Sequence, residues 1–236
     1  MSIQSNYTLC YHHHLLVSST FPFAFIFDLD GVVIHSTPMH NLAWETYLEP
    51  YGIPREQVQT RMHGLRNDEI VRGFFGTELD PAQVLAHGAA KEALFRKMMA
   101  PQLDQHIVPG VRRFLELHAK APIGLASNAE RANIDFVLDG VGIRHYFQAV
   151  VDGHQAKRPK PFPDIYRMAA DLLGRHSRDC VIFEDSPAGV QAARDSGAHV
   201  VGLTTTLAEL TGVDLIIDNF DDPRLQTWLW QLEPSR

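Results

Sequence analysis

An apolar run that ends in two acids and a glycine places the strongest constraint on the fold of this chain. Residues 23–27 are continuously apolar, and Asp28, Leu29, Asp30 and Gly31 follow at once. Such a run is typical of a strand that is covered on both faces, as in the interior of a parallel sheet. Open α/β sheets bind ligands at the carboxyl ends of their strands, so the two carboxylates are predicted to lie at that edge. Taken alone, the pattern fits equally well a strand end with two solvated acids.

The segment after this strand is helical in pattern throughout. Thr37-Pro38 is predicted to be an N-cap followed by proline at the first helical position. Apolar residues recur at helical spacing from there to about residue 105, and no strand-like alternation interrupts them. We interpret residues 38–105 as an all-helical insertion, with Trp44 and the pair Phe74-Phe75 in its apolar interior.

From residue 108 onward the pattern changes to helices that alternate with short apolar strands. Strands are expected at 123–126, 147–151, 180–183, 199–203 and 214–217, with helices at 111–119, 131–141, 163–173 and 188–196 between them. This alternation favours parallel strands joined by right-handed crossovers. The predicted fold class is α/β: a doubly wound, Rossmann-like parallel sheet with a small helical cap inserted after the first strand. The expected domains are an N-terminal extension (1–20), the core (21–37 and 106–236) and the cap (38–105).

Composition and charge narrow the classes of partner. The 236 residues are 45% hydrophobic and carry a formal net charge of −7, without a long basic run, which argues against nucleic acid or an anionic membrane. No apolar run approaches the roughly 20 residues of a membrane-spanning helix, and residues 1–20 lack the pattern of a signal peptide. Cys10 and Cys180 do not suggest a disulfide framework. We therefore expect a cytoplasmic protein, a monomer or weak dimer, that binds neither nucleic acid nor membrane.

Polar residues follow three of the predicted strands, and one lysine lies in a proline-rich loop before a helix. They are Asp28 and Asp30, Ser127 and Asn128, Glu184 and Asp185, and Lys160. Because parallel strands end at the same edge of a sheet, these side chains are expected to converge on one crevice. Clustered carboxylates repel one another unless a cation lies among them, and Mg²⁺ prefers oxygen ligands and shares its shell with phosphate. Ser127 before a predicted helix and the cation of Lys160 suit a phosphate group.

The order of these motifs resembles that of the haloacid dehalogenase superfamily of phosphatases and phosphomutases. The resemblance spans residues 22–218 and rests on DxDGV, the strand ending in Ser-Asn, Lys-Pro-x-Pro-Asp, and Glu-Asp-Ser-x-x-Gly. It implies that Asp28 is the nucleophile of an aspartyl-phosphate intermediate and that Asp30 is the general acid and base. It also implies that Ser127 and Lys160 hold the phosphoryl group. The expected Mg²⁺ ligands are Asp28, Asp30 through its backbone carbonyl, Asp185, and Glu184 directly or through water.

Within the superfamily the chain resembles most the β-phosphoglucomutase-like branch. The branch implies that His40 interacts with the acid/base aspartate and that Lys91 contacts substrate, although a packing role for His40 and a solvated charge for Lys91 are the alternatives. The chain departs from the mutases at three cations: their cap arginine falls at Asn67, a cap lysine at His63 and a core lysine at Glu130. Arg66 is a candidate replacement. The expected substrate-binding residues are Asn128, His40, Arg66 and Lys91.

The sequence is compatible with three functions. The first is a Mg²⁺-dependent phosphatase that hydrolyses a small phosphorylated metabolite, a sugar phosphate, through an aspartyl-phosphate. The second is a hexose-phosphate mutase of the β-phosphoglucomutase type, which the missing cations disfavour because a mutase must hold a second phosphate. The third is a non-catalytic binding protein on the same fold, which is disfavoured because acids are costly to keep in a crevice without a metal.

Overall fold

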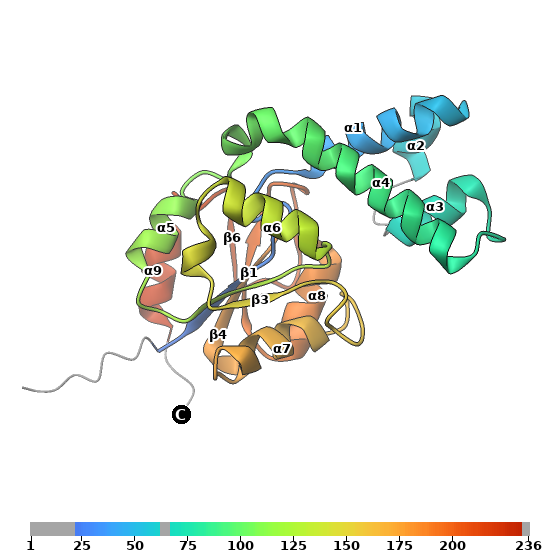
Figure 1. Cartoon of the computed structure of the whole chain (residues 1–236). Helices are drawn as coiled ribbons and strands as arrows, with labels where there is room; N and C mark the ends of the chain where they lie inside the picture. Colours follow the sequence, from blue (N-terminus) through green and yellow to red (C-terminus); the bar gives the residue numbers. More distant parts are fainter. Residues whose placement is uncertain (1–21, 62–66, 233–236) are drawn as a thin grey trace, which may run out of the picture.

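A parallel sheet of six strands forms the central layer of the molecule (Figure 1); the computed structural model describes residues 22–61 and 67–232. The strands lie in the order β3-β2-β1-β4-β5-β6, and every neighbouring pair is parallel. They are β1 (Ala24–Phe27), β2 (Ile123–Ala126), β3 (Ala149–Val151), β4 (Cys180–Glu184), β5 (His199–Leu203) and β6 (Leu215–Ile217). This is the strand order of a Rossmann-like sheet, so the predicted fold class is confirmed.

The two strands that lead into acids lie side by side at the centre of the sheet. Phe27 of β1 is paired with Phe183 of β4, so Asp28 and Glu184 come next to each other where the strands end. Successive strands extend to one edge of the sheet from β1 and to the other edge from β4. Such a reversal of strand order is where open α/β sheets form a ligand-binding crevice.

Helices cover both faces of the sheet. On the face that carries Phe25 and Phe27 the covering helices are α5 (Val111–Leu117), α6 (Arg131–Gly140) and α9 (Pro223–Gln231). On the opposite face they are α7 (Asp164–Leu172) and α8 (Pro187–Ser196). All four residues of β1 are buried, and so are those of β2. Because both faces of these strands are covered, their sequences are continuous apolar runs.

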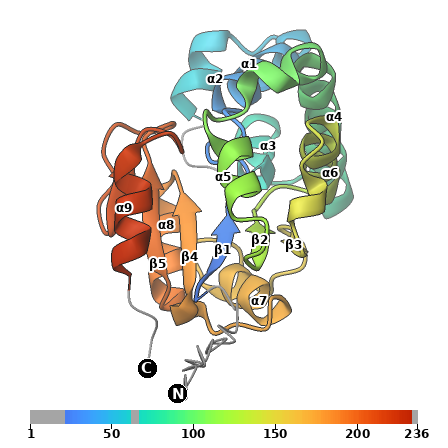
Figure 2. The same cartoon turned by 90° about the vertical axis from the view of Figure 1, so that its left-hand side faces the viewer.

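Four helices extend beyond the carboxyl ends of the strands, and Figure 2 shows them at the end of the molecule towards which β1 and β4 point. They are α1 (Thr37–Leu48), α2 (Arg55–Arg61), α3 (Asn67–Phe75) and α4 (Pro81–Met99). They share an apolar cluster that is separate from those of the sheet. It is formed by Trp44, Leu48, Val58, Ile70, Val71 and Val84, with Phe74 and Phe75 packed against it. The predicted apolar role of Trp44 and of the phenylalanine pair is therefore confirmed.

The chain enters and leaves this helical segment through two connections that pair with each other. Ile34 and Ile107 form an antiparallel bridge. On either side of it, the amide of His35 donates to the carbonyl of His106 at 2.7 Å, and the amide of Val108 donates to that of Val33 at 3.1 Å. The entry and the exit of the segment are thus held together by backbone hydrogen bonds.

The structure differs from the sequence-based expectations at a few element boundaries. Helix α1 begins at Thr37, and its N-cap is Ser36 instead of Thr37. The Ser36 hydroxyl makes no capping bond because it donates to the Asp30 carboxylate at 2.6 Å. Strand β3 begins at Ala149, two residues late, since the chain at 144–146 forms a 3₁₀ turn. Helix α9 was not predicted, although Leu225, Trp228 and Leu229 lie at helical spacing and pack against the core of the sheet.

Some expectations concern residues outside the described ranges. The N-terminal extension (1–20) and Arg66 are among them. Within the described ranges, none of the helices combines the length and the apolar character needed to cross a membrane.

Candidate active site

Three carboxylates converge where β1 and β4 end. Asp28, Glu184 and Asp185 are all buried, and each offers an oxygen within 4.8 Å of the others. Burial raises the pKa of Asp28 to about 7, and the negative charges of Glu184 and Asp30 act in the same direction. The positive charge of Lys160 opposes this rise and only partly offsets it. Burial and the charges of Glu184 and Asp28 raise the pKa of Asp185 to about 8. The three carboxylates are oxygen donors, and each opposes the ionisation of the others. Such a group fits a hard divalent cation, which would offset their negative charges.

Lys160 joins two of these carboxylates. Its Nζ atom donates to Asp28 Oδ1 at 2.7 Å and to Glu184 Oε1 at 2.6 Å, and the side chain is buried. Burial alone would lower the pKa of Lys160, but the two carboxylates raise it above its ordinary value. The lysine is therefore charged, and it fixes one oxygen of Asp28 while the other stays available for chemistry.

Glu184 is held by donors from the protein on both of its oxygens. Besides Lys160, Oε1 accepts from the hydroxyl of Tyr166 on α7 at 2.5 Å. Oε2 accepts from the amides of Asp185 at 3.0 Å and Ser186 at 3.2 Å. Burial would raise the pKa of Glu184, but the charge and hydrogen bond of Lys160 and the Tyr166 bond hold it below its usual range. Glu184 therefore keeps its negative charge and orients Lys160.

Asp185 is oriented by a residue from a distant loop. The Thr206 hydroxyl, in the loop after β5, donates to Asp185 Oδ2. Gly31 makes room for the same carboxylate, because a Cβ at residue 31 would lie 1.8 Å from Asp185 Oδ2, and the φ of +77° there favours glycine. Because Thr206 and Gly31 both contact Oδ2 of Asp185, its Oδ1 remains for the cluster of carboxylates with Asp28 and Glu184.

Asp30 has a different environment from Asp28. Its Oδ1 accepts from Ser36 Oγ at 2.6 Å and lies 3.5 Å from His40 Nε2. Burial would raise the pKa of Asp30, but the hydrogen bonds and charge of His40 and the Ser36 bond lower it overall. The two aspartates of the first motif are thus separated in both direction and acidity.

Ser127 and Asn128 lie beside this group, as expected from their place after β2. Ser127 is buried, and its Oγ accepts from the amide of Ala129 at 3.2 Å. Asn128 Oδ1 accepts from the backbone amide of Lys160 at 3.2 Å, which ties the lysine loop to the end of β2. Both residues line a pocket of about 270 Å³ together with Asp28, Lys160 and Asp185. A phosphoryl group is of a size that this pocket accommodates.

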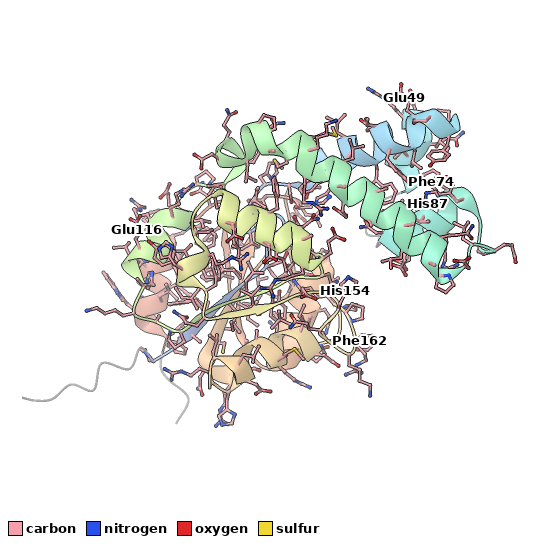
Figure 3. The ribbon with its side chains drawn as sticks, in the orientation of Figure 1. Glu49, Phe74, His87, Glu116, His154 and Phe162 are labelled. Carbon is pink, nitrogen blue, oxygen red and sulfur yellow. The ribbon has the colours of Figure 1, made fainter. Side chains whose placement is uncertain are left out.

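A larger pocket of about 750 Å³ adjoins the small one and extends between the helical segment and the sheet domain. The two share residues of both parts, among them Asp30, Thr37, Asn128 and Thr206. Figure 3 shows one rim residue of the larger pocket, His154, at the side of the sheet domain that faces the helical segment. The shared residues make the two pockets parts of one space at the carboxyl ends of the strands.

His40 of α1 and Lys91 of α4 line the larger pocket near Asp30. Lys91 is buried, and its Nζ lies 3.0 Å from His40 Nδ1 and 2.5 Å from Glu92 Oε1. The alternative of a solvated charge for Lys91 is therefore wrong. The His40 ring also stacks on Phe95 with a centroid distance of 3.8 Å, so packing and contact with Asp30 occur together.

Sequence patterns missed several residues of this site. Tyr166 and Thr206 contact the acids directly, Ser36 contacts Asp30, and Glu92 contacts Lys91. Tyr166 lies six residues after Lys160 and one turn into α7, which is a signal that local spacing could have supplied. Glu92 is the neighbour of Lys91 in the sequence, whereas Thr206 is brought to Asp185 from 21 residues away by tertiary packing.

Comparisons with known proteins agree with this geometry. A family model described as haloacid dehalogenase-like hydrolase matches residues 24–197. Over 179 residues the chain is 32% identical to the fructose-1-phosphate phosphatase YqaB of Escherichia coli (strain K12), covering 75% of this chain and 93% of that protein. It is 30% identical over 213 residues to the β-phosphoglucomutase of Bacillus subtilis (strain 168), covering 86% and 92%. The crystal structure of a HAD hydrolase, family IA, variant 3, from Entamoeba histolytica has the same fold, with a TM-score of 0.79 at 23% identity over 88% of this chain and 97% of that one.

Proposed function

The chain belongs to the haloacid dehalogenase-like hydrolase family, and on this premise we propose that it is a Mg²⁺-dependent phosphatase of a small sugar phosphate. The observation that carries the proposal is the contact of Lys160 with Asp28 inside the group formed with Glu184 and Asp185. A carboxylate that is oriented by a lysine and placed beside a cation site has what a phosphoryl-accepting nucleophile needs. The relatives named for sugar-phosphate chemistry support the substrate class.

Mg²⁺ is the cation that this set of oxygen donors fits. Asp28 and Asp185 would hold it with the backbone carbonyl of Asp30, and Glu184 would contact it directly or through water. When bound, the ion supplies charge neutralisation and polarises the phosphoryl oxygens. It would also lower the pKa values of Asp28 and Asp185, so that both are ionised at neutral pH.

The chemistry assigned to this chain has two halves. In the first, the free oxygen of Asp28 attacks phosphorus, the bond from phosphorus to the ester oxygen breaks, and Asp30 gives a proton to that oxygen. In the second, Asp30 takes a proton from a water that attacks the aspartyl-phosphate, which releases inorganic phosphate and restores the Asp28 carboxylate. Lys160 and Ser127 hold the phosphoryl oxygens throughout.

The acidity of Asp30 suits the second half directly, because contacts with His40 and Ser36 favour its ionised form. In the first half Asp30 must carry a proton. A phosphate dianion that binds beside Asp30 adds a like charge and raises its pKa, so arrival of substrate favours protonation. His40 and Ser36 are therefore proposed to position Asp30 for both steps.

We also propose that residues 38–105 act as a cap over a core formed by 21–37 and 106–236. Asn128 from the core and His40 and Lys91 from the helical segment line the larger pocket, which gives each part a share in substrate binding. A cap that covers this pocket excludes water from the aspartyl-phosphate until the alcohol has left. Arg66 stays a candidate for the same pocket.

A hexose-phosphate mutase is the second candidate, because the β-phosphoglucomutase of Bacillus subtilis matches more of this chain than the phosphatase does. The contact of His40 with Asp30 is also what the resemblance to the mutases implies. The three positions where the mutases have cations instead hold Asn67, His63 and Glu130. Hydrolysis is therefore the favoured reaction.

The test is turnover of a panel of sugar phosphates with Mg²⁺, run beside conversion of β-glucose 1-phosphate to glucose 6-phosphate. We expect phosphate release by the wild type and none by Asp28→Asn, since the nucleophile is lost; the matched control is Asp171→Asn, an exposed residue of α7. Isomerisation without phosphate release would favour the mutase, and an Asp28→Asn protein that keeps most of its activity would contradict the mechanism. Failure to act on any ester would favour the non-catalytic alternative.

A further inference from the structure

One wall of the larger pocket is built from carboxylates, amides and one lysine, which are linked by hydrogen bonds. We call it the carboxylate wall; its members are Asn67, Lys91, Glu92, Glu130 and Asn133, and all five line the pocket. They come from α3, α4 and α6 and from the residue before α6, so the wall joins the helical segment to the sheet domain.

Glu92 is the centre of the wall. Its Oε1 accepts from Lys91 Nζ at 2.5 Å and from Asn67 Nδ2 at 2.6 Å, and its Oε2 accepts from Asn133 Nδ2 at 2.6 Å. The side chain is buried, and although burial would raise its pKa, Lys91 and His40 hold it below the usual range. Glu92 is thus ionised, and it accepts one hydrogen bond from each of three neighbours.

Glu130 offsets the charge of a second cation, Arg96. Arg96 NH1 donates to Glu130 Oε1 at 2.5 Å and to Asn133 Oδ1 at 2.6 Å. The charges of Arg96 and Glu130 offset each other, as do those of Lys91 and Glu92. The wall therefore has no net positive charge to offer to a second phosphate.

After these bonds the wall still offers both acceptors and donors to a ligand, because each amide NH₂ group has a second N–H and the Lys91 ammonium has a third. A carboxylate can only accept, so Asn67 must turn its NH₂ group towards Glu92, which leaves its carbonyl oxygen for the pocket. Glu130 is about a quarter exposed at its side chain and has a second carboxylate oxygen. Acceptors of this kind recognise hydroxyl groups, which donate, and they repel phosphate, which at neutral pH accepts and is negative.

We propose that the carboxylate wall determines substrate specificity: it binds the hydroxyl groups of a neutral polyol and disfavours a ligand that carries a second phosphate. The proposal deepens the function proposed above and rests on it. It assigns the selecting role to Asn67 and Glu130, with Glu92 and Asn133 as positioning residues that fix the orientation of the amides.

One other cation of the pocket provides the competing outcome. Arg72 of α3 lines the same pocket, and its NH1 donates to the backbone carbonyls of Thr77 at 3.2 Å and Leu79 at 3.0 Å. These bonds direct the guanidinium towards the end of its own helix. If Arg72 nevertheless held a second phosphate, a bisphosphate would bind at least as tightly as the matching monophosphate.

Calorimetric titration of the Asp28→Asn protein with Mg²⁺ tests recognition without turnover. The ligands are fructose 1-phosphate and fructose 1,6-bisphosphate, which differ only in the second phosphate. We expect the monophosphate to bind at least about tenfold more tightly, because the bisphosphate meets acceptors and negative charge. Adding Glu130→Gln should reduce this ratio to below about threefold, whereas the control Glu116→Gln, on the exposed side of α5, should leave it unchanged.

A second variant covers the case in which Glu130→Gln fails to fold. Asn67→Leu keeps the shape of the side chain, and we expect it to weaken binding of the monophosphate about tenfold by removing a hydroxyl acceptor. A bisphosphate that binds as well as the monophosphate, a ratio insensitive to Glu130→Gln, or no binding of either sugar overturns the proposal. Wild-type hydrolysis of p-nitrophenyl phosphate, measured in parallel, reports separately on the proposed function.

Discussion

Two aspartates only two residues apart acquire opposite acidities in this protein. Burial among carboxylates raises the pKa of Asp28 to about 7, whereas the bonds from His40 and Ser36 outweigh burial at Asp30 and lower its pKa. The difference follows from direction: Asp28 faces Glu184 and Lys160, and Asp30 faces the start of α1. A cation and a substrate that bind later would reverse both tendencies, which suits a nucleophile and an acid.

Thr206 allows a test of how the metal ligands are oriented. Replacement by valine removes the hydroxyl that donates to Asp185 and keeps the shape of the side chain. Loss of such an outer partner typically costs about 10–100-fold in metal affinity, so we expect Thr206→Val to weaken Mg²⁺ binding by at least about tenfold. Titration calorimetry measures this directly, and Thr206→Ser should restore the affinity. Unchanged binding by the valine variant would mean that Asp185 is oriented without Thr206.

At the scale of elements, the glycine at the start of α8 is fixed by the carboxylate below it. A Cβ on Gly189 would lie 1.8 Å from Glu184 Oε1, and that oxygen already accepts from Lys160 and Tyr166. A methyl group here must displace α8 or break the bonds of a buried charge. The glycine of the Glu-Asp-Ser-x-x-Gly motif is therefore required for packing as well as for helix entry.

We expect Gly189→Ala to lower the free energy of unfolding by about 3 kcal/mol or more, because it disrupts a buried ionic network. The matched control is Gly88→Ala in α4, where the nearest atom to the added Cβ is 3.9 Å away. That change should stabilise the protein by roughly 0.5–1 kcal/mol through helix propensity. Urea unfolding of both variants provides the measurement, and equal effects of the two substitutions would contradict the packing argument.

Local patterns predicted most elements, and they failed where tertiary contacts compete. The runs at 23–27 and 180–183 are buried on both faces, which makes them recognisable without knowledge of their partners. Ser36 could not be identified as the N-cap of α1, because its hydroxyl is taken by Asp30 instead of the helix. The contact of Arg96 in α4 with Glu130, the N-cap of α6, joins residues 34 positions apart, and no spacing rule anticipates it.

At the scale of the whole molecule, the clustered carboxylates Asp28 and Asp185 lower the free energy of unfolding as long as no cation is bound. A carboxyl whose pKa is raised from 3.8 to about 8, as at Asp185, contributes stability at low pH that is lost as the pH rises through about 8. The reason is that the native state keeps a proton that the unfolded chain has released. The group that we propose to bind the ion is therefore unfavourable in its absence.

The expected consequence is that Asp185→Asn raises the unfolding temperature of the metal-free protein, by an amount that grows between pH 5 and pH 8. Each kcal/mol corresponds to about 2–4 °C in a domain of this size. Addition of Mg²⁺ should raise the unfolding temperature of the wild type and not that of the variant. Thermal unfolding with and without EDTA checks both, with Asp171→Asn as the control; a variant less stable than the wild type at pH 8 would be inconsistent with repulsion among the acids.

The overall arrangement was predicted in outline but not in its distances. Alternating strands and helices indicated a doubly wound sheet, and the order of strands around β1 and β4 then brought Asp28 beside Glu184. The larger pocket depends on how α4 lies against α6. The contacts between them join Arg96 to Glu130 and Asn133, and Glu92 to Asn133. These contacts are not visible in the sequence motifs, so the motifs left the substrate open.

The pairing of the two connections near Ile34 and Ile107 has a consequence for engineering. Opposite residues of an antiparallel bridge lie only about 4.5–5.5 Å apart, which a two-residue turn can span. The roughly seventy residues between them therefore form a cassette that leaves and rejoins the chain at one point. Such a cassette can be removed, or exchanged for that of a relative with another specificity, while the sheet and its acids keep their connectivity.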